Sequence, residues 1–191
     1  MNVKRIAIFA SGSGTNAQNI IHYFSDNEAI EVDSLWSNKP KAYALSRAEA
    51  NGVKTFVFNR EQFYETEQIA QKLKERDIDL VVLAGFLWLV PDNLVENFRI
   101  INIHPALLPK YGGKGMYGMK VHQSVVDNKE SETGISIHFV NKKYDEGELI
   151  FQAKCPVLQT DSPEEVATKV HELEYKHFPV VIEQILLPEG K

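Results

Sequence analysis

Residues 5–16, with the sequence RIAIFASGSGTN, decide the fold of this chain. The short apolar run from Arg5 to Phe9 predicts a strand, and Ser11 to Asn16 predicts a glycine-rich turn. The residues from about Ala17 to Phe24 predict a helix directly after this turn. Glycines let the backbone approach an anion closely, and a helix N-terminus offers free N–H groups and a positive dipole end. The turn therefore predicts a binding site for a phosphate monoester.

Three other interpretations compete for this turn. A dinucleotide site of the Gly-x-Gly-x-x-Gly type is disfavoured, because Ala17 holds the third glycine position and the second predicted strand ends in Ser37-Asn38 rather than in an acid. A P-loop is excluded, because no Lys-Ser or Lys-Thr pair follows at the required spacing. The third interpretation is a plain strand-to-helix turn without a ligand.

Outward from this unit, apolar runs alternate with segments of helical spacing. Further strands are predicted at residues 29–37, 54–58, 80–84 and 99–104, and further helices at 41–50 and 61–76. In the helix at 61–76, Phe63, Ile69 and Leu73 are predicted to face inward. This order predicts an α/β fold, with an open, mostly parallel twisted sheet and helices on both faces. Ligands then belong at the carboxyl ends of the strands.

The last third of the chain changes character. Thr133 to Val140 alternates between its two faces, and Leu149 to Pro156 predicts a partner for it, as an antiparallel addition to the sheet. Ser162 to Glu165 forms a capping box that opens a C-terminal helix. We expect Pro179 to kink or split that helix. No repeat or linker interrupts the pattern, so a single domain is predicted over residues 1–191.

Composition narrows the class of protein. The chain has 191 residues and a formal net charge of −5, which gives little support to a general nucleic-acid-binding surface. The longest apolar run, Leu80 to Val90, is too short to span a membrane. The single cysteine, Cys155, cannot form an internal disulfide, which favours a reducing cytoplasm. No metal site is predicted, because the histidines show no ligand spacing.

Two polar segments are candidates for catalysis. Asn102 and His104 share one face at the end of a predicted strand, roughly 7 Å apart from two strand steps. An amide that stabilises an oxyanion beside an imidazole that handles protons suits acyl transfer. Asp145, in the loop from Lys143 to Gly147, can orient a histidine and stabilise its charged form. The alternatives are a structural histidine and a turn aspartate that bonds its own backbone.

One apolar segment is a candidate ligand wall. Gly85 to Val90 follows a predicted buried strand, and core packing is the ordinary interpretation of such residues. Its place beyond the end of the strand also suits a wall for a flat heteroaromatic ligand.

Taken together, these motifs are more specific than any one of them. Their order is a Gly-x-Gly-Thr-Asn turn, Val-Leu-Ala-Gly-Phe, Asn-Ile-His-Pro-x-Leu-Leu-Pro, Gly-x-Ser-Ile-His-Phe-Val and Asp-x-Gly. Over essentially the whole chain, this resembles the phosphoribosylglycinamide formyltransferase family, the folate-dependent GAR transformylases of purine synthesis. The resemblance implies transfer of a formyl group from 10-formyltetrahydrofolate to the amine of glycinamide ribonucleotide (GAR). It also implies a phosphate-binding N-terminal half and a folate-binding, catalytic C-terminal half.

The resemblance further implies roles for individual residues. Catalysis is assigned to Asn102, His104 and Asp145, with Asn102 also facing the folate. The other implied contacts are Gly14, Thr15 and Asn16 for the substrate phosphate, Glu174 for the region of the glycinamide amine, Leu87, Trp88, Leu89 and Val90 for the folate ring, and Arg60 for the folate tail. We expect no metal, nucleic acid or membrane partner, and either a monomer or a homodimer.

Two segments depart from the family pattern. The loop Lys110 to Gly118 replaces a Pro-Gly-x-His-like segment, whose later histidine matches His122, and its glycines suggest a mobile flap. Trp88 stands where a polar or basic residue is often found. The alternatives are another 10-formyltetrahydrofolate-dependent formyltransferase or hydrolase, and a non-catalytic phosphate- or nucleotide-binding module, which would not need Asn102, His104 and Asp145 together.

Overall fold

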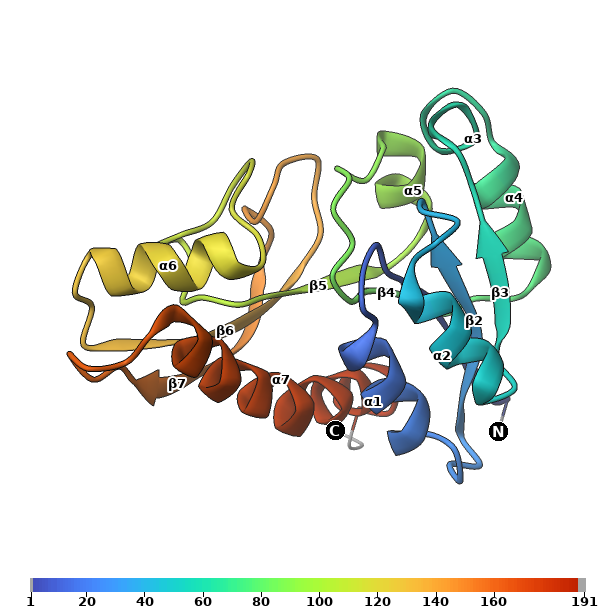
Figure 1. The fold of residues 1–191 in the computed structure, drawn as a ribbon. Coiled ribbons are helices and arrows are strands. Elements are labelled where there is room, and N and C mark those ends of the chain that lie inside the picture. The colour runs from blue at the N-terminus through green and yellow to red at the C-terminus, as the bar shows by residue number, and fades with distance from the viewer. Residues whose placement is uncertain (1, 189–191) are drawn as a thin grey trace.

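A seven-stranded sheet organises the chain, in the order β3-β2-β1-β4-β5-β6-β7 (Figure 1). The computed structural model describes residues 2–188. The strands are β1 Lys4–Phe9, β2 Ile30–Ser37, β3 Lys54–Val57, β4 Leu80–Leu83, β5 Ile100–His104, β6 Glu132–Phe139 and β7 Leu149–Pro156. The first five are parallel, whereas β6 pairs antiparallel with β5, and β7 pairs antiparallel with β6. The predicted fold class, with its antiparallel addition, is confirmed.

The chain changes direction across the sheet at β1. It moves outward through β2 and β3, and then returns to place β4 on the other side of β1. The segments that follow β1 and β4 are tied together, because the Ser11 amide donates to the Gly85 carbonyl and the Ala84 amide donates to the Phe9 carbonyl. In an open α/β sheet, such a switch point is where ligands bind.

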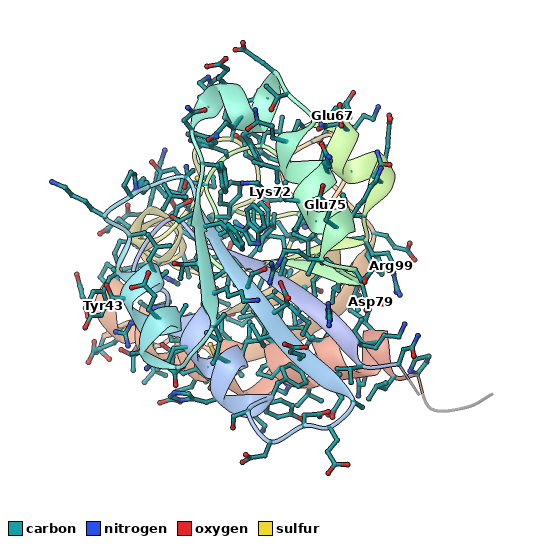
Figure 2. All side chains as sticks on the ribbon, turned by 90° about the vertical axis from the view of Figure 1, so that its right-hand side faces the viewer. Tyr43, Glu67, Lys72, Glu75, Asp79 and Arg99 are labelled. Carbon is teal, nitrogen blue, oxygen red and sulfur yellow. The ribbon has the colours of Figure 1, made fainter. Side chains whose placement is uncertain are left out.

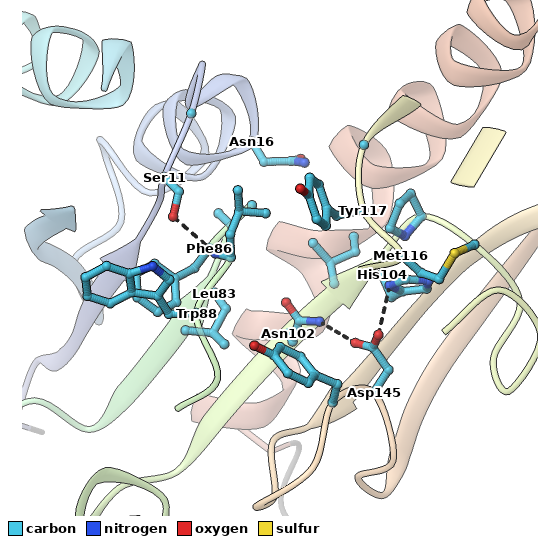
Figure 3. A pocket seen from close by; sticks show the side chains of 18 of the residues that line it. Ser11, Asn16, Leu83, Phe86, Trp88, Asn102, His104, Met116, Tyr117 and Asp145 are labelled. Carbon is cyan, nitrogen blue, oxygen red and sulfur yellow. Dashed lines mark hydrogen bonds and ion pairs between the residues drawn. The ribbon is translucent and has the colours of Figure 1, made fainter. Parts of the chain in front are cut away.

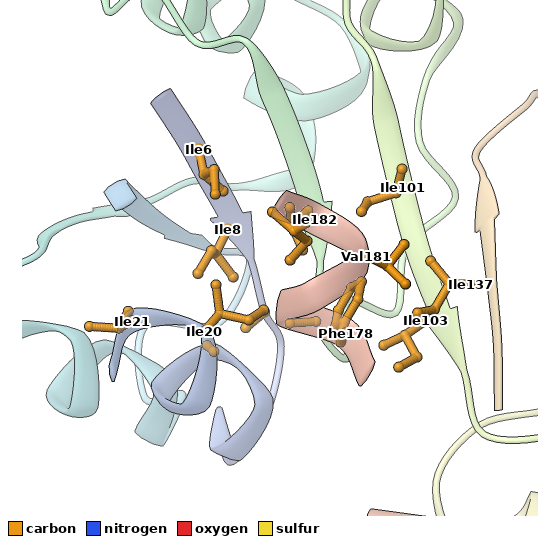
Figure 4. Packing of buried hydrophobic residues seen from close by; sticks show 14 of the residues in the cluster. Ile6, Ile8, Ile20, Ile21, Ile101, Ile103, Ile137, Phe178, Val181 and Ile182 are labelled. Atoms are coloured by element: carbon orange, nitrogen blue, oxygen red, sulfur yellow. The ribbon is translucent and has the colours of Figure 1, made fainter. Parts of the chain in front are cut away.

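Helices cover both faces of the sheet. They are α1 Thr15–Tyr23, α2 Tyr43–Ala50, α3 Arg60–Tyr64, α4 Gln68–Glu75, α5 Asp92–Asn97, α6 Met119–Asp127 and α7 Pro163–Leu186. One core packs α1, α2 and α7 on the sheet and includes Ile6, Ile8, Ile20, Phe178 and Ile182 (Figure 4). The core on the other face packs α3, α4 and α5 and includes Phe9, Trp36, Phe63, Leu73 and Leu94. No helix within residues 2–188 is long and apolar enough to cross a membrane.

The predicted single helix at residues 61–76 is wrong, because it divides into α3 and α4. The Thr66 hydroxyl donates to the Gln62 carbonyl and accepts from the Gln68 amide, so it ends one helix and supports the start of the next. The predicted inward side chains of this segment are nevertheless buried: Phe63, Ile69 and Leu73. On α4, the flanking Lys72 and Glu75 (labelled in Figure 2) are exposed. The sequence pattern did not predict α5 and α6.

Of the two effects predicted for Pro179, a kink or a split of the C-terminal helix, the split is wrong, since α7 is continuous from Pro163 to Leu186. Proline lacks the N–H that would satisfy the carbonyl four residues earlier. That carbonyl belongs to Tyr175, and it accepts a hydrogen bond of 2.9 Å from the Asn19 side-chain amide on α1. Pro179 is buried together with its neighbour Phe178, so packing and this replacement hydrogen bond hold the helix together.

We expect Asn19→Ala to lower the free energy of unfolding by about 0.5 kcal/mol, because water then replaces the protein donor at the exposed Tyr175 carbonyl. Urea unfolding measures this loss. In a Pro179→Ala background, the backbone N–H of residue 179 can satisfy the same carbonyl, so Asn19→Ala should then have a smaller effect. Equal losses in the two backgrounds would show that Asn19 acts elsewhere.

Candidate functional site

A cavity of about 670 Å³ lies at the carboxyl ends of the strands, over the switch point (Figure 3). Its walls come from the turn after β1, the segment after β4, the end of β5, the loop before α6, the β6–β7 loop and α7. It brings together these residues singled out from the sequence: Gly14, Thr15, Asn16, Leu87, Trp88, Leu89, Val90, Asn102, His104, His122, Asp145 and Glu174. Arg60 is not among the lining residues.

The turn after β1 requires glycine at position 14. Gly14 has a φ of 74° and precedes α1, and a Cβ there would lie 2.5 Å from Ala44. Gly12, in contrast, has no atom within 4 Å of an added Cβ and lines the cavity. Gly14 is the N-cap residue of α1, and it has no side chain to accept a hydrogen bond from the first backbone N–H groups of the helix. The backbone of this turn is therefore open to a ligand, and the helix end beside it favours an anion.

Glu174 joins this turn to α7. Its Oε2 accepts hydrogen bonds of 2.8 Å from Asn16 Nδ2 and from His171 Nδ1, and the residue is only 4% exposed. The hydrogen bond to Glu174 raises the pKa of His171. Asn16 Oδ1 is buried without a partner, so it is available to a ligand that brings a donor. The sequence did not predict a role for His171, although this residue stands three positions before Glu174 on a predicted helix.

Asn102, His104 and Asp145 meet at the end of β5. Asp145 Oδ2 lies 3.5 Å from His104 Nδ1, and Asn102 Nδ2 donates to Asp145 Oδ1 at 3.4 Å. Figure 3 shows the carboxylate turned toward both side chains. His104 is 3% exposed, and the Asp145 side chain is 11% exposed. Asp145, on a loop distant in sequence, thus contacts both Asn102 and His104. The alternation of side chains along the strand had predicted that these two residues share a face.

His138 is a further member of this cluster that the sequence did not single out. It faces Asn102 across the β5–β6 pair. Its Nδ1 is 2.9 Å from the Phe139 carbonyl and donates to it, which leaves Nε2 to accept from Asn102 Nδ2 at 3.1 Å. His138 Nε2 also lies 3.6 Å from Asp145 Oδ1. The position of His138 opposite Asn102 depends on the register between β5 and β6, which the sequence pattern does not specify.

The protonation states follow from burial and from these neighbours. Burial lowers the pKa of His104, and the charge of Asp145 and the Tyr111 carbonyl offset this only in part. Burial alone would raise the pKa of Asp145, but the neighbouring His138 and His104 and the Gly113 amide together hold it below its usual value. At neutral pH, Asp145 is therefore ionised and His104 is predominantly neutral. The pair can accept a proton.

His122 lies in the same cavity but differs from His104. Burial lowers its pKa to about 4, and its Nδ1 is buried without a hydrogen-bond partner. It therefore stays neutral at neutral pH and contributes a polar surface rather than a charge.

The apolar wall serves both the cavity and the core. Trp88 contacts a cluster of aromatic rings whose centroids are 5.6–6.4 Å from its own: Phe58, Phe63, Tyr64 and Phe86. The Arg60 guanidinium lies 4.8 Å from the Tyr64 ring centroid and 6.0 Å from that of Trp88, so it stacks beside the wall. The Leu87 amide donates to the Ser11 hydroxyl, which ties the wall to the glycine-rich turn.

No group of three or more His, Cys, Asp or Glu side chains in the described part of the chain is arranged to hold a metal ion. The cavity brings together an amide, an imidazole and a carboxylate beside an anion-binding turn and an apolar wall.

Comparison with known proteins agrees with this chemistry. The family model described as formyl transferase matches residues 4–182. Phosphoribosylglycinamide formyltransferase of Haemophilus influenzae is 37% identical over 187 residues, which cover 94% of this chain and 86% of that protein. The chloroplastic phosphoribosylglycinamide formyltransferase of Arabidopsis thaliana is 38% identical over 94% of this chain, which spans only 64% of that relative.

The solved structures give the same result. The crystal structure of phosphoribosylglycinamide formyltransferase from Anaplasma phagocytophilum matches with a TM-score of 0.88 and 30% identity, covering 100% of this chain and 90% of that one. The crystal structure of phosphoribosylglycinamide formyltransferase from Bacillus halodurans matches with a TM-score of 0.85 and 33% identity. The match covers 97% of this chain and 96% of that one. The chain therefore belongs to the formyl transferase family.

Proposed function

We propose that this protein transfers the formyl group of 10-formyltetrahydrofolate to the amine of GAR, in purine synthesis. The observation that carries the proposal is the meeting of Asn102, His104 and Asp145 between an anion-binding turn and an apolar wall. The relatives named phosphoribosylglycinamide formyltransferase support this substrate pair. A single catalytic domain, a monomeric or homodimeric state and a cytoplasmic location belong to the same proposal.

The two substrates occupy different parts of the cavity. The turn at residues 12–16 takes the GAR phosphate, and Glu174, across the Asn16 hydrogen bond, faces the remainder of that substrate. The wall at residues 87–90 takes the folate ring, with Arg60 stacked at its rim for the folate tail. The amine and the formyl carbon then meet above Asn102. The turn at residues 12–16 lies in the N-terminal half of the chain, and Asn102, His104 and Asp145 lie in the C-terminal half.

The side chains at the end of β5 perform the chemistry. The neutral amine attacks the formyl carbon, and negative charge develops on the formyl oxygen. Asn102 stabilises this charge with one N–H, because its contact of 3.4 Å with Asp145 is long and easily exchanged. His104 accepts the amine proton, becomes an imidazolium beside Asp145, and returns the proton to the departing folate nitrogen. No covalent bond to the enzyme is required.

The test is transfer of an isotope-labelled formyl group from 10-formyltetrahydrofolate to GAR. We expect labelled formyl-GAR and an equal amount of tetrahydrofolate. Labelled formate without formyl-GAR would indicate a hydrolase. GAR binding without turnover would indicate a non-catalytic module, and either result would overturn the proposal.

We expect Gly12→Ala to raise the KM for GAR by about tenfold and to leave the KM for the folate nearly unchanged, because the added methyl obstructs an anion at the turn. The methyl meets no protein atom within 4 Å, so folding should be retained. Gly14→Val cannot serve here, because its side chain collides with Ala44. Steady-state kinetics with each substrate varied in turn measures the effect, and an equal rise in both KM values would contradict the assignment of this turn.

A further inference from the structure

The second ring nitrogen of His104 has a partner that the proposed mechanism does not use. His104 Nε2 lies 2.8 Å from the backbone carbonyl of Tyr111, whereas Nδ1 faces Asp145. A carbonyl oxygen can only accept, so Nε2 must carry a hydrogen. In the neutral ring this leaves the lone pair on Nδ1, beside the carboxylate. The hydrogen bond at one nitrogen thereby selects which nitrogen is basic.

The Tyr111 carbonyl is held in place by its own side chain. The Tyr111 hydroxyl donates to Glu130 Oε1 at 2.8 Å, and Lys110 Nζ donates to the same oxygen at 2.9 Å. The Tyr111 ring is partly buried against the core that includes α7. Glu130 follows α6, and its side chain is 24% exposed. Tyr111 is therefore anchored through its side chain, and this anchor fixes the position of its backbone carbonyl.

The backbone around His104 is held in an uncommon conformation. Tyr111 and Asp145, its two partners, have φ values of 57° and 56°, in the left-handed region. Such values are uncommon outside glycine and persist where surrounding contacts enforce them. A Cβ on Gly112 would lie 2.5 Å from Leu108 and 3.3 Å from Asp145, so the segment packs tightly there. The Gly113 amide donates to Asp145 Oδ2 at 2.9 Å. Residues 111–113 thus contact both members of the acid–base pair.

We propose that Tyr111 is a positioning residue for His104: its hydroxyl bond to Glu130 fixes the carbonyl that keeps the proton on Nε2 and the basic lone pair on Nδ1. This inference rests on the proposed function for its effect on turnover, but its effect on the imidazole exists in the free protein. Four other titratable groups surround His104: Asp145, His138 and Glu174 shift its pKa, and His104 in turn lowers the pKa of His122. Substitution at Tyr111 or Glu130 leaves all four in place.

We expect Tyr111→Phe to lower kcat about three- to tenfold, as for the loss of one hydrogen bond, with both KM values changed less than twofold. The phenylalanine ring keeps the packing, so the protein should fold. Nitrogen-15 NMR of the free protein should show neutral His104 as a mixture of tautomers, where the wild type shows the Nε2–H form alone. The pKa of His104 should fall, because a fixed acceptor at Nε2 favours the imidazolium.

Two further variants distinguish a positioning role of Tyr111 from a general loss of protein stability. Glu130→Ala should reproduce both effects, and the double variant with Tyr111→Phe should be no worse than either single variant. Lys110→Met removes the ion pair but keeps the tyrosine bond, so its His104 spectrum should match the wild type. A wild-type His104 tautomer and pKa in both Tyr111→Phe and Glu130→Ala would overturn the proposal. If the wild type transfers no formyl group, the proposed function fails, but the spectra still decide the role of Tyr111.

Discussion

Replacing His104 with alanine is expected to lower kcat by about 10²- to 10⁴-fold, the range for removal of an acid–base group. The expected size follows from the surroundings of the imidazole. It is 3% exposed, predominantly neutral because burial lowers its pKa, and directed at Asp145 through Nδ1. Water cannot easily replace a base in that position. Steady-state kinetics measures kcat, and calorimetric titration should find the affinity for GAR nearly unchanged.

His122 offers a matched control for this variant. It is also a buried histidine in the cavity, but burial lowers its pKa to about 4 and its Nδ1 has no hydrogen-bond partner, so it is a weak base. We therefore expect His122→Ala to lower kcat by much less than His104→Ala does. Near-wild-type turnover in His104→Ala, or equal losses in the two variants, would remove His104 from its catalytic role.

The sequence predicted the parts of the site that depend on local order. Alternation along β5 placed Asn102 and His104 on one face, and the glycine spacing placed an open turn before α1. The contact between Asn16 and Glu174 joins residues 158 positions apart, and only the family resemblance had linked them. Local pattern predicts which residues share an element, but not which distant elements meet.

The error at Pro179 and the omission of His138 and Tyr111 have the same origin. Pro179 stays inside α7 because Asn19, on another helix, supplies a donor that no pattern within α7 reveals. His138 joins the catalytic cluster through the register of β6 on β5, which is a property of two strands. The role of Tyr111 depends on a backbone carbonyl, whose direction a side-chain motif does not encode.

Asp145→Asn is expected to lower kcat by about 10²- to 10⁴-fold while keeping the fold, because the substitution removes a charge and little volume. Asparagine tolerates the φ of 56° at this position as well as aspartate does. The carboxylate also accepts hydrogen bonds from Asn102 and from the Gly113 amide, on its two oxygens. The amide group of asparagine has a single oxygen, so it can face only one of these donors while its NH₂ group opposes the other.

The pH dependence distinguishes a catalytic Asp145 from a turn aspartate. The charge of Asp145 raises the pKa of His104 against the stronger opposing effect of burial, so its removal must lower that pKa further. His104 acts as a base only when neutral, and activity falls as the pH drops through its pKa. The acidic limb of the pH–rate profile should therefore move to lower pH in Asp145→Asn, with the remaining activity reduced at every pH. NMR titration of His104 in the free enzyme measures the same shift directly, which matters because a kinetic limb can belong to a coupled pair. A turn aspartate predicts lower stability with an unchanged His104 titration, and that result would exclude Asp145 from the acid–base pair.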